Sequence, residues 1–361
     1  MAASTPQGVS VLKTLETIRK DPELRQSFVR TIVQWEKAAR IVRPNLREEA
    51  SGPLVDSVHL DNEVMQKELH DGTIFQFLYR SKIAREFVMS DPELPDHVWE
   101  PQTTRLLVRL ARGARSAVIG GAYFGDHTIL VAQEMARCGG TVHAFEPDSS
   151  QRSMLEHNVT LNALSNVRIN GEGLWDSKRE GLRLSGQDAY ATMMEDDAGG
   201  DSTGISTVRL DDYLRAQHLT EVDLIMLDLE GAEQMALKGT GDFLTLPPGK
   251  APNLVFEIHR NYVDWTHGLH RTEVVQWLTG LGYSVFAVRD FNANQDMKGS
   301  PVELIPCDSV YLEGPPHGFN MAAFKDTRLL SDDCFRIVRG VSPKLLLHKD
   351  PALYHPVGGM P

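Results

Sequence analysis

Short apolar runs alternate with amphipathic segments from residue 116 to residue 288, and this alternation is the strongest constraint on the fold. Apolar runs bounded by glycine or acid are typical of buried strands, whereas longer segments with one apolar face are typical of helices. Strands that alternate with helices predict an α/β fold, a doubly wound sheet covered by helices on both faces. We predict strands at 116–120, 141–145, 166–170, 223–227, 253–258, 283–288 and 309–312, and helices at 128–137, 149–161 and 271–281.

The segment before this alternation has a different pattern. Residues 1–99 are expected to form a helical N-terminal accessory region, with a further helical stretch over 64–89. An apolar stripe at helical spacing marks one of its helices, at Phe28, Ile32, Trp35, Ala39 and Val42. The stripe favours packing against the main domain, and a homodimer contact is the alternative, because the repeat is too short for a coiled coil.

The main domain is expected to span residues 100–313. Pro101 opens the helix that leads into the first strand, since proline is favoured at the first helical position. Residues 314–361 are rich in proline and glycine, so we expect them to be an irregular tail.

The composition limits the classes of partner. The chain of 361 residues has a formal net charge of −12 and no long basic run, so nucleic acid and acidic membranes are poor partners. Its 3 cysteines are scattered and form no zinc or redox spacing. The first residues lack the apolar core of a signal peptide, and no run of about 18 apolar residues occurs. We therefore expect a cytoplasmic protein that acts on a small molecule.

A glycine-rich turn, Gly-Gly-Ala-Tyr-Phe-Gly at 120–125, joins the first predicted strand to the next helix. Glycine lets backbone amides approach a ligand closely, and the following helix offers its N-terminus. Glu146 ends the next strand about 20 residues later, where a carboxylate accepts hydrogen bonds from both ribose hydroxyls of an adenosine. Helix capping is the alternative for Glu146, but Asp148 is better placed for it. The pattern predicts an adenosine-containing cofactor.

The glycine spacing and the adjacent charge distinguish between adenosine cofactors. A dinucleotide fingerprint requires Gly-x-Gly-x-x-Gly, whereas this turn has Gly121-x-x-x-Gly125 followed by Asp126. A carboxylate at that point repels a pyrophosphate, but it tolerates S-adenosyl-L-methionine, which carries an ammonium and a sulfonium. We therefore expect S-adenosyl-L-methionine, bound in part by Gly121 and Gly125. A nicotinamide-dependent oxidoreductase is the alternative.

Six segments, in this order, resemble the FkbM-type S-adenosylmethionine-dependent methyltransferases over about residues 100–290. They are Gly-Ala-Tyr-Phe-Gly at 121–125, Ala-Phe-Glu-Pro at 144–147, Asn158 to Asn162, Leu-Asp-Asp at 210–212, Asp-Leu-Glu-Gly-Ala-Glu at 228–233 and Phe-Glu-Ile-His at 256–259. The resemblance implies a class I methyltransferase fold, a Rossmann-like seven-stranded sheet whose last strand is antiparallel. It also implies methyl transfer to a hydroxyl, often on a sugar or a natural-product scaffold. It places Trp175 near the adenine, with a core tryptophan as the alternative.

Three residues depart from the family pattern. Ile119 stands where the family usually has Asp, Tyr123 where it has Asn, and Met226 where it often has Lys. Tyr123 is expected to stack on or cover the methionine part of the cofactor. The departures also leave open a binding module that keeps the methyltransferase fold without catalysis.

Carboxylates and a histidine follow two strands that are neighbours in the family topology. Asp228 ends the strand at 223–227, and Glu257 and His259 end the strand at 253–258, so all three are expected to face one cleft. Transfer to a hydroxyl requires positioning and a general base with a near-neutral pKa. We expect His259 to be that base, with Asp228 or Glu257 orienting it or binding acceptor hydroxyls. Asp228 is also expected to border the cofactor.

A metal ion is the alternative use of these side chains. Catechol O-methyltransferase-like enzymes hold Mg²⁺ with carboxylates at the same two strand ends, where the ion lowers the pKa of the acceptor hydroxyl. Asp228, Glu257 and His259 show no fixed ligand spacing, so the sequence predicts no metal ligand. Glu230 and Glu233, three residues apart, are expected to stabilise a helix N-terminus.

Overall fold

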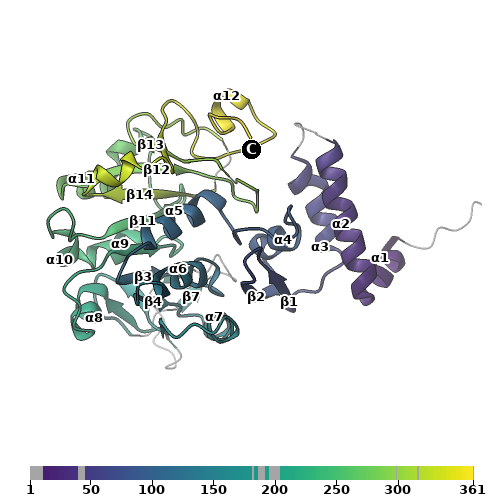
Figure 1. Ribbon diagram of the computed structural model, residues 1–361, viewed down its shortest axis with the longest axis horizontal. Helices are drawn as coiled ribbons and strands as arrows, with labels where there is room; N and C mark the ends of the chain where they lie inside the picture. The colour runs from purple at the N-terminus through teal and green to yellow at the C-terminus, as the bar shows by residue number, and fades with distance from the viewer. Residues whose placement is uncertain are drawn as a thin grey trace, which may run out of the picture.

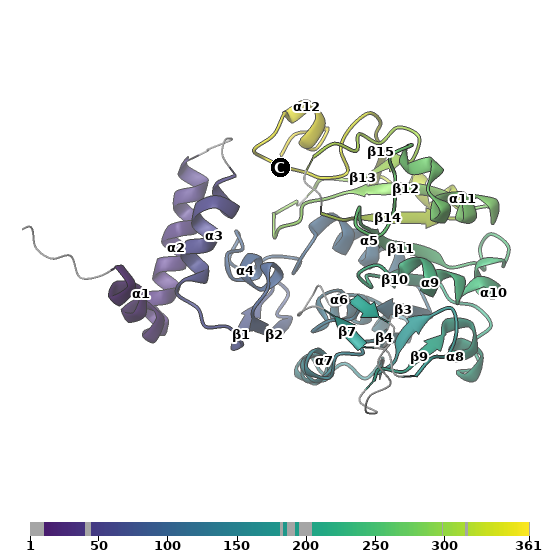
Figure 2. The ribbon, with the colours of Figure 1, turned by 180° about the vertical axis from the view of Figure 1, so that it is seen from behind.

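A nine-stranded mixed sheet with helices on both faces dominates the chain (Figure 1). The computed structural model describes residues 11–39, 45–180, 183–185, 192–194, 204–297, 299–314 and 317–360. The N-terminal residues form a smaller body of helices and a hairpin beside the sheet (Figure 2). The predicted α/β class with an N-terminal accessory region is confirmed. Within the described ranges, no helix is long and apolar enough to cross a membrane.

The sheet has the strand order β15-β13-β12-β14-β11-β10-β3-β4-β5. Its strands are β3 (Ser116–Gly120), β4 (Thr141–Phe145), β5 (Val167–Asn170), β10 (Leu224–Leu227), β11 (Asn253–Ile258), β12 (Ser284–Arg289), β13 (Val302–Pro306), β14 (Phe319–Phe324) and β15 (Phe335–Ile337). The helices around it are α5 (Pro101–Ala111), α6 (Asp126–Ala136), α7 (Ser149–Leu161), α8 (Leu210–Ala216), α9 (Glu233–Lys238), α10 (Gly241–Leu244), α11 (Glu273–Gly280) and α12 (Pro351–Tyr354). Two small pairs join β6 (Gly173–Trp175) to β9 (Thr207–Arg209) and β7 (Arg183–Ser185) to β8 (Thr192–Met194).

The inner strands form the class I arrangement that the resemblance implies. β5, β4, β3, β10 and β11 run parallel, and β14 lies antiparallel between β11 and β12. The antiparallel strand is not where we predicted it, because residues 309–312 form no strand and residues 319–324 supply it. The expectation of an irregular tail from residue 314 is therefore wrong for this strand, which lies inside the sheet. β13 and β15 extend the sheet beyond β12.

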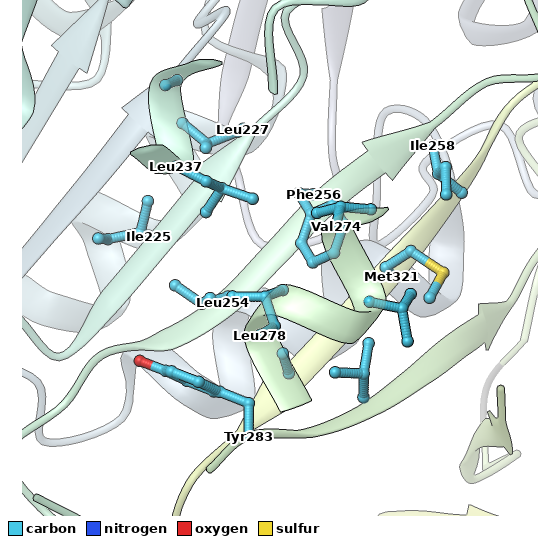
Figure 3. Close-up of a cluster of buried hydrophobic side chains, with 14 of the residues drawn as sticks. Ile225, Leu227, Leu237, Leu254, Phe256, Ile258, Val274, Leu278, Tyr283 and Met321 are labelled. Carbon is cyan, nitrogen blue, oxygen red and sulfur yellow. The ribbon is translucent and has the colours of Figure 1, made fainter. Parts of the chain in front are cut away.

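Alternate residues of the central strands face opposite helical layers. Figure 3 shows one layer, in which residues of β10 and β11 pack against Val274 and Leu278 of α11. The opposite layer buries Ile119 and Met226 with apolar residues of α5, α6 and α7. Each fully buried aliphatic or aromatic side chain contributes about 1.5–3 kcal/mol. Both layers hold the sheet rigidly, so the strand ends are fixed relative to one another.

The stretch 64–89, predicted to be helical, is mostly a hairpin. β1 (Glu63–Glu68) pairs antiparallel with β2 (Ile74–Tyr79), and only α4 (Lys82–Val88) is helical. In β2, Phe75, Phe77 and Tyr79 are buried and their neighbours are partly exposed, which is the two-residue period of a strand. The prediction was wrong because this aromatic run also fits one face of a helix.

The apolar stripe of the N-terminal region packs within that region only in part, because Trp35 is 43 % exposed. It lies on α2 (Pro22–Ala39), which follows α1 (Val11–Lys20), and Val42 lies outside the described residues. Val29 of α2 is buried with Val55 of α3 (Gly52–Asp56) and Met89, and Ile32 packs beside them. β1, β2 and α4 stand between these helices and the sheet in both ribbon views (Figures 1 and 2). The stripe therefore does not contact the sheet domain as expected, and the homodimer contact stays a prediction.

Asn158 of α7 and Asn162, which follows the last residue of that helix, fasten the hairpin to the sheet domain. The side chain of Asn158 accepts a hydrogen bond from the Gln76 amide and donates to the Gln76 carbonyl, at 2.8 Å each. Asn162 makes the same pair of bonds with the backbone of Ile74. An amide side chain can bond a strand edge as a neighbouring strand would, because it offers one donor and one acceptor in a plane. The accessory region is thereby fixed beside the predicted site.

Candidate functional site

The residues predicted to form the site meet at one edge of the sheet. Because β3, β4, β10 and β11 are parallel neighbours, their carboxyl ends bring together the turn 120–125, Glu146, Asp228 and Glu257. Gly121 has φ +73°, and a Cβ there would lie 1.8 Å from the carbonyl oxygen of Asp228. Only glycine fits at this position, so the turn packs directly on the acidic loop.

Glu146 lies inside this edge with its carboxylate held by backbone amides. Its Oε2 accepts from the amide of Tyr123 at 2.8 Å and its Oε1 from the amide of Asp148 at 2.9 Å. Only 7 % of the residue is exposed, and this burial raises the pKa of Glu146 to about 7, although the amides oppose the rise. Each carboxylate oxygen can accept a second hydrogen bond, so Glu146 is held in place to bind a pair of hydroxyls. Asp148 caps α7, as expected.

The side chain of Tyr123 lies between the glycine turn and the start of α4. Its hydroxyl lies 3.1 Å from the Ser81 hydroxyl, and its ring packs with the aromatic cluster of the hairpin. Its backbone is left-handed, with φ +48°, and its amide bonds Glu146. Tyr123 therefore joins the turn to the accessory region, and its place over the methionine part of the cofactor stays a prediction.

Trp175 lies against the acidic loop, at the end of β6. Its ring packs with Leu229 and Ala232, and the guanidinium of Arg179 lies 5.6 Å from the ring centre. The indole N–H is buried and has no hydrogen-bond partner among the described residues. Trp175 is thus placed beside the site, with an unused donor.

The acidic loop after β10 has a strained backbone held by Glu233. Glu230 has φ +48° and Gly231 φ +104°, a left-handed pair that is costly for a residue with a side chain. Glu233 Oε1 accepts from the Leu229 amide at 2.7 Å, and both its oxygens accept from the Gly231 amide. The ring of Tyr262 covers Gly231, where a Cβ would lie 2.8 Å from it. Glu233 therefore has the structural role that we expected.

The carboxylates of this edge repel one another in a buried setting. The pKa of Asp228 is raised to about 7, mainly by burial and then by the negative charges of Glu233 and Asp126. Burial and Asp228 raise the pKa of Glu230 to about 8. Burial raises the pKa of Glu257 and of Glu100 well above the usual range, with Asp228 contributing to both. No salt bridge joins any of these acids to a basic side chain in the described part of the chain, so a cation would relieve the repulsion.

His259 is partly buried beside this cluster, at the end of β11. Its Nδ1 accepts a hydrogen bond from the Asn261 amide at 3.0 Å, so the neutral ring carries its proton on Nε2. Burial and the charge of Lys344 lower the pKa of His259. The ring therefore offers a donor to the site. A base role for His259 would require a change of tautomer.

Three further residues border the site, and the sequence did not indicate them. Asn320 of β14 donates to Glu100 Oε2 at 2.6 Å, and His317 and Lys344 lie near His259. They lie in the segment predicted to be irregular, so no pattern in the sequence connected them to the site. Glu100, which precedes α5, has a left-handed backbone with φ +51°.

Three carboxylates of the cluster could hold a metal ion. One oxygen each of Asp228, Glu233 and Glu257 lies within 4.8 Å of the others. The sequence suggested Asp228, Glu257 and His259 as possible Mg²⁺ ligands. In the structure, Glu233 takes the place of His259 in this set. Oxygen ligands suit Mg²⁺, but Oε1 of Glu233 already accepts two backbone amides and Oε2 accepts one, so Glu233 has little capacity left for an ion.

The departures at 119 and 226 lie side by side in the sheet. Ile119 and Met226 are direct neighbours in the register of β3 and β10, and both are buried in the same apolar layer. The family pattern would place Asp and Lys at these adjacent positions. An apolar pair in place of an acid and a base keeps the local charge balanced, because no single charge is left buried.

Part of the sheet domain is similar to a known protein family. Residues 120–285 match the methyltransferase FkbM domain family. A comparison with curated protein sequences finds no match. An FkbM methyltransferase of Methylobacillus flagellatus is similar in structure, at 12 % identity and TM-score 0.37, over 59 % of this chain and 44 % of that one, so the chain spans less than half of that protein. A precorrin-6y C5,15-methyltransferase of Geobacter metallireducens is similar at 12 % identity and TM-score 0.36, over 62 % of this chain and 88 % of that one.

Proposed function

Residues 120–285 form a methyltransferase FkbM domain, and we propose on this basis that the protein is an S-adenosylmethionine-dependent O-methyltransferase. Its acceptor is a hydroxyl of a small polar molecule, such as a sugar or a natural-product scaffold. The observation that carries the proposal is the convergence of the turn 120–125, Glu146 and Asp228 at one edge of the sheet.

The residues at this edge offer hydrogen-bond acceptors and negative charge that suit S-adenosylmethionine. Glu146 is fixed by two amides and can accept both ribose hydroxyls. Trp175 lies beside the acidic loop, and its indole N–H has no partner among the described residues. We expect the adenine of the cofactor to bind next to this ring. The cluster of Asp228, Glu230 and Glu257 favours a cationic ligand, because a positive charge stabilises the ionised carboxylates.

When bound, S-adenosylmethionine supplies an electrophilic methyl group on a positively charged sulfur. Asp228 is our candidate for the base that takes the proton of the acceptor hydroxyl, because its pKa of about 7 suits proton transfer near neutral pH. Glu257 would bind a second acceptor hydroxyl, and His259 would donate through Nε2 to an acceptor oxygen. These roles require the three side chains to hold the acceptor in line with the sulfur.

The accessory region completes the acceptor side of the site. Lys82 of α4 lies over the Trp99 ring, 5.8 Å from its centre, and its charge lowers the pKa of His317 after burial does. Glu100 follows directly and bonds Asn320. Lys82, Trp99, Glu100 and Asn320 lie outside residues 120–285, which match the family. We therefore place selectivity between acceptors at these residues.

Two other functions have weaker support. A nicotinamide-dependent oxidoreductase would need a pyrophosphate next to Asp126, a buried carboxylate that forms no salt bridge with a lysine or arginine within the described ranges. A binding module without catalysis was suggested by Ile119 and Met226, and their pairing in the sheet accounts for both changes without loss of the site.

Calorimetric titration of the full chain with S-adenosylmethionine, S-adenosylhomocysteine and NADH tests the cofactor. We expect both sulfur ligands to bind and NADH not to bind. Glu146→Ala should weaken both by about 10- to 100-fold, because two hydrogen bonds to a charged group are lost. Glu156→Ala, an exposed glutamate of α7, is the control and should change nothing. Tight NADH binding, or no effect of Glu146→Ala, would contradict the proposal.

Methyl transfer is tested with methyl-labelled S-adenosylmethionine and a panel of hydroxylated sugars and polyketides. Labelled product that resists alkaline hydrolysis indicates an ether rather than an ester. Binding of the cofactor with no transfer to any hydroxyl, but with transfer to an amine panel, would show a different acceptor atom.

A further inference from the structure

The loop that follows β11 contains a cavity of about 540 Å³. It is lined by residues 260–266, among them Arg260, Tyr262 and Trp265. Small-molecule pockets in proteins commonly have volumes of about 300–1,000 Å³, so this cavity is large enough for a small ligand. The residues to which we assigned the cofactor and the transferred proton do not include those of this loop.

Tyr262 connects the cavity to the acidic loop and to His259. Its ring covers Gly231, where a Cβ would lie 2.8 Å from it, and its centre is 5.6 Å from the centre of the His259 ring. Gly231 belongs to the same loop as Asp228, our candidate base. A molecule in the cavity would therefore lie beside the methyl-transfer edge, and the ring of Tyr262, which is 44 % exposed, offers it a flat apolar face.

Arg260 and Lys344 bring two positive charges to this region from distant parts of the sequence. Arg260 lines the cavity. Trp265, which also lines it, packs on Phe319 with ring centres 5.5 Å apart, and Nζ of Lys344 lies 6.0 Å from the centre of the Phe319 ring. Burial and then the charge of Arg260 lower the pKa of Lys344 to about 8, and Glu257 opposes the fall. The two cations are therefore neighbours, and Lys344 is only 5 % exposed.

The charge of Arg260 is available to a ligand. Its exposed guanidinium makes no salt bridge and no hydrogen bond within the described part of the chain. Asp264 lines the same cavity, but its Oδ1 accepts from the Thr266 amide at 2.9 Å and from the Thr266 hydroxyl at 2.5 Å. This carboxylate is thus engaged within its own turn. Nε2 of His317, just before β14, is buried and has no partner among the described residues, so the neighbouring wall holds a further polar group.

The two sides of the site therefore differ in charge. Asp228, Glu230 and Glu257 on one side suit the positively charged sulfur of the proposed cofactor. The side formed by Arg260 and Lys344 attracts an anion instead, because neighbouring positive charges are stabilised by a negative ligand. The sulfur is cationic and belongs with the acids, so the anion that suits this second side is a group of the acceptor.

We propose that the acceptor carries a carboxylate or a phosphate, which binds in the cavity at 260–266 to Arg260, with Lys344 beside it. The inference rests on the proposed function and adds a substrate class to it. A guanidinium can bind either group through two parallel hydrogen bonds, because its planar fork of donors matches both anions. With the anion on Arg260 and the carbon skeleton along Tyr262, the acceptor hydroxyl would be directed toward Asp228.

Ligand-observed NMR titrations of the full chain with S-adenosylhomocysteine bound test the inference. The probes are glucose, glucuronate and glucose 6-phosphate, which share one sugar ring and differ in the group at its sixth carbon. We expect at least one of the two anions to bind about 10-fold or more tightly than glucose, because hydrogen bonds between charged groups contribute at least this factor. Tighter binding of glucuronate indicates a carboxylate acceptor, and tighter binding of glucose 6-phosphate indicates a phosphorylated one.

Variants of the two cations locate the bound anion. Arg260→Gln should weaken the preferred anion by about 10-fold and leave glucose within about twofold. Lys344→Met should weaken the same anion. Arg271→Gln makes the first change at another exposed arginine, which does not line the cavity, and should alter no affinity. If the nearly buried Lys344 cannot be replaced without unfolding, the exposed Arg260 still decides the matter.

Equal affinity for glucose and both anions, or no binding of either anion, overturns the inference. An anion preference that persists unchanged in Arg260→Gln overturns it too, because the anion then binds elsewhere. The titrations are repeated without S-adenosylhomocysteine, so that anion binding is measured independently of the cofactor. Failure of S-adenosylhomocysteine to bind is a different result, because it refutes the proposed function itself.

Discussion

Replacement of Asp228 by Asn should stabilise the fold at high pH while removing methyl transfer. In the folded chain burial raises the pKa of Asp228 from its ordinary value of 3.8 to about 7. Between these values the folded state holds a proton that the unfolded state has released. The stability that Asp228 contributes is therefore full below about pH 4 and is lost as the pH rises through about 7.

The size of the effect follows from the same values. The rise in pKa corresponds to about 4 kcal/mol at 1.36 kcal/mol for each pH unit. Part of Asp228 remains exposed, so solvent screening should reduce this to about 2 kcal/mol. An unfolding entropy of about 2.1 cal/mol/K per residue converts 2–4 kcal/mol into a rise in Tm of about 3–5 °C.

Thermal unfolding at pH 5 and pH 8, followed by circular dichroism, measures this difference. We expect Asp228→Asn to raise Tm by about 3–5 °C at pH 8 and by less at pH 5. Asp333→Asn, at an exposed carboxylate outside the site, is the control and should leave Tm unchanged at both pH values. A Tm that falls at pH 8, or a gain of the same size at both pH values, would refute the reasoning about a buried, repelled carboxylate.

Three further predictions concern cofactor affinity, metal and the accessory region. Affinity for S-adenosylmethionine should rise from pH 6 to pH 8.5, because Asp228 and Glu230, with pKa values of about 7 and 8, must ionise to hold a cation. Calorimetry in buffers of different ionisation enthalpy should show that binding releases protons. Proton uptake on binding would contradict this prediction. Dialysis against EDTA should leave methyl transfer unchanged, because Glu233 already accepts two amides at Oε1 and one at Oε2, and activity that only Mg²⁺ restores would contradict this. Asn158→Ala should cost about 2–3 kcal/mol in urea unfolding, since the backbone of Gln76 loses buried partners, whereas the exposed change His157→Ala should cost little.

The inner elements of the sheet domain were predictable because their patterns are local. β4, β11 and α7 have the predicted bounds, since each is a short apolar or amphipathic segment bounded by turn or capping residues. Parallel strands inside a sheet are buried on both faces, so their apolar runs are nearly continuous. Because the ends of these runs can be read from the sequence, the meeting of the turn, Glu146, Asp228 and Glu257 at one edge of the sheet was predictable too.

The remaining site residues depend on contacts between distant parts of the chain. β14 was missed because its sequence, Phe-Asn-Met-Ala-Ala-Phe, places a polar residue inside a buried strand. Asn320 is tolerated there because Glu100, more than 200 residues earlier, accepts its hydrogen bond. No window of sequence contains both partners, so neither the strand nor its role could be inferred from pattern.

The roles of individual side chains also required geometry. The hydroxyl of Tyr123 lies beside Ser81, on a left-handed backbone. The Asn261 amide donates to Nδ1 of His259 and so sets the tautomer of its ring. Both features arise from backbone conformation and hydrogen bonds, which spacing along the chain does not report.

A crystal structure of the full chain with S-adenosylhomocysteine tests the central claim most directly. The account predicts the ribose hydroxyls on Glu146 and the sulfur facing Asp228. A ligand bound elsewhere, or with its ribose away from Glu146, would contradict the assignment of this edge of the sheet as the methyl-transfer site.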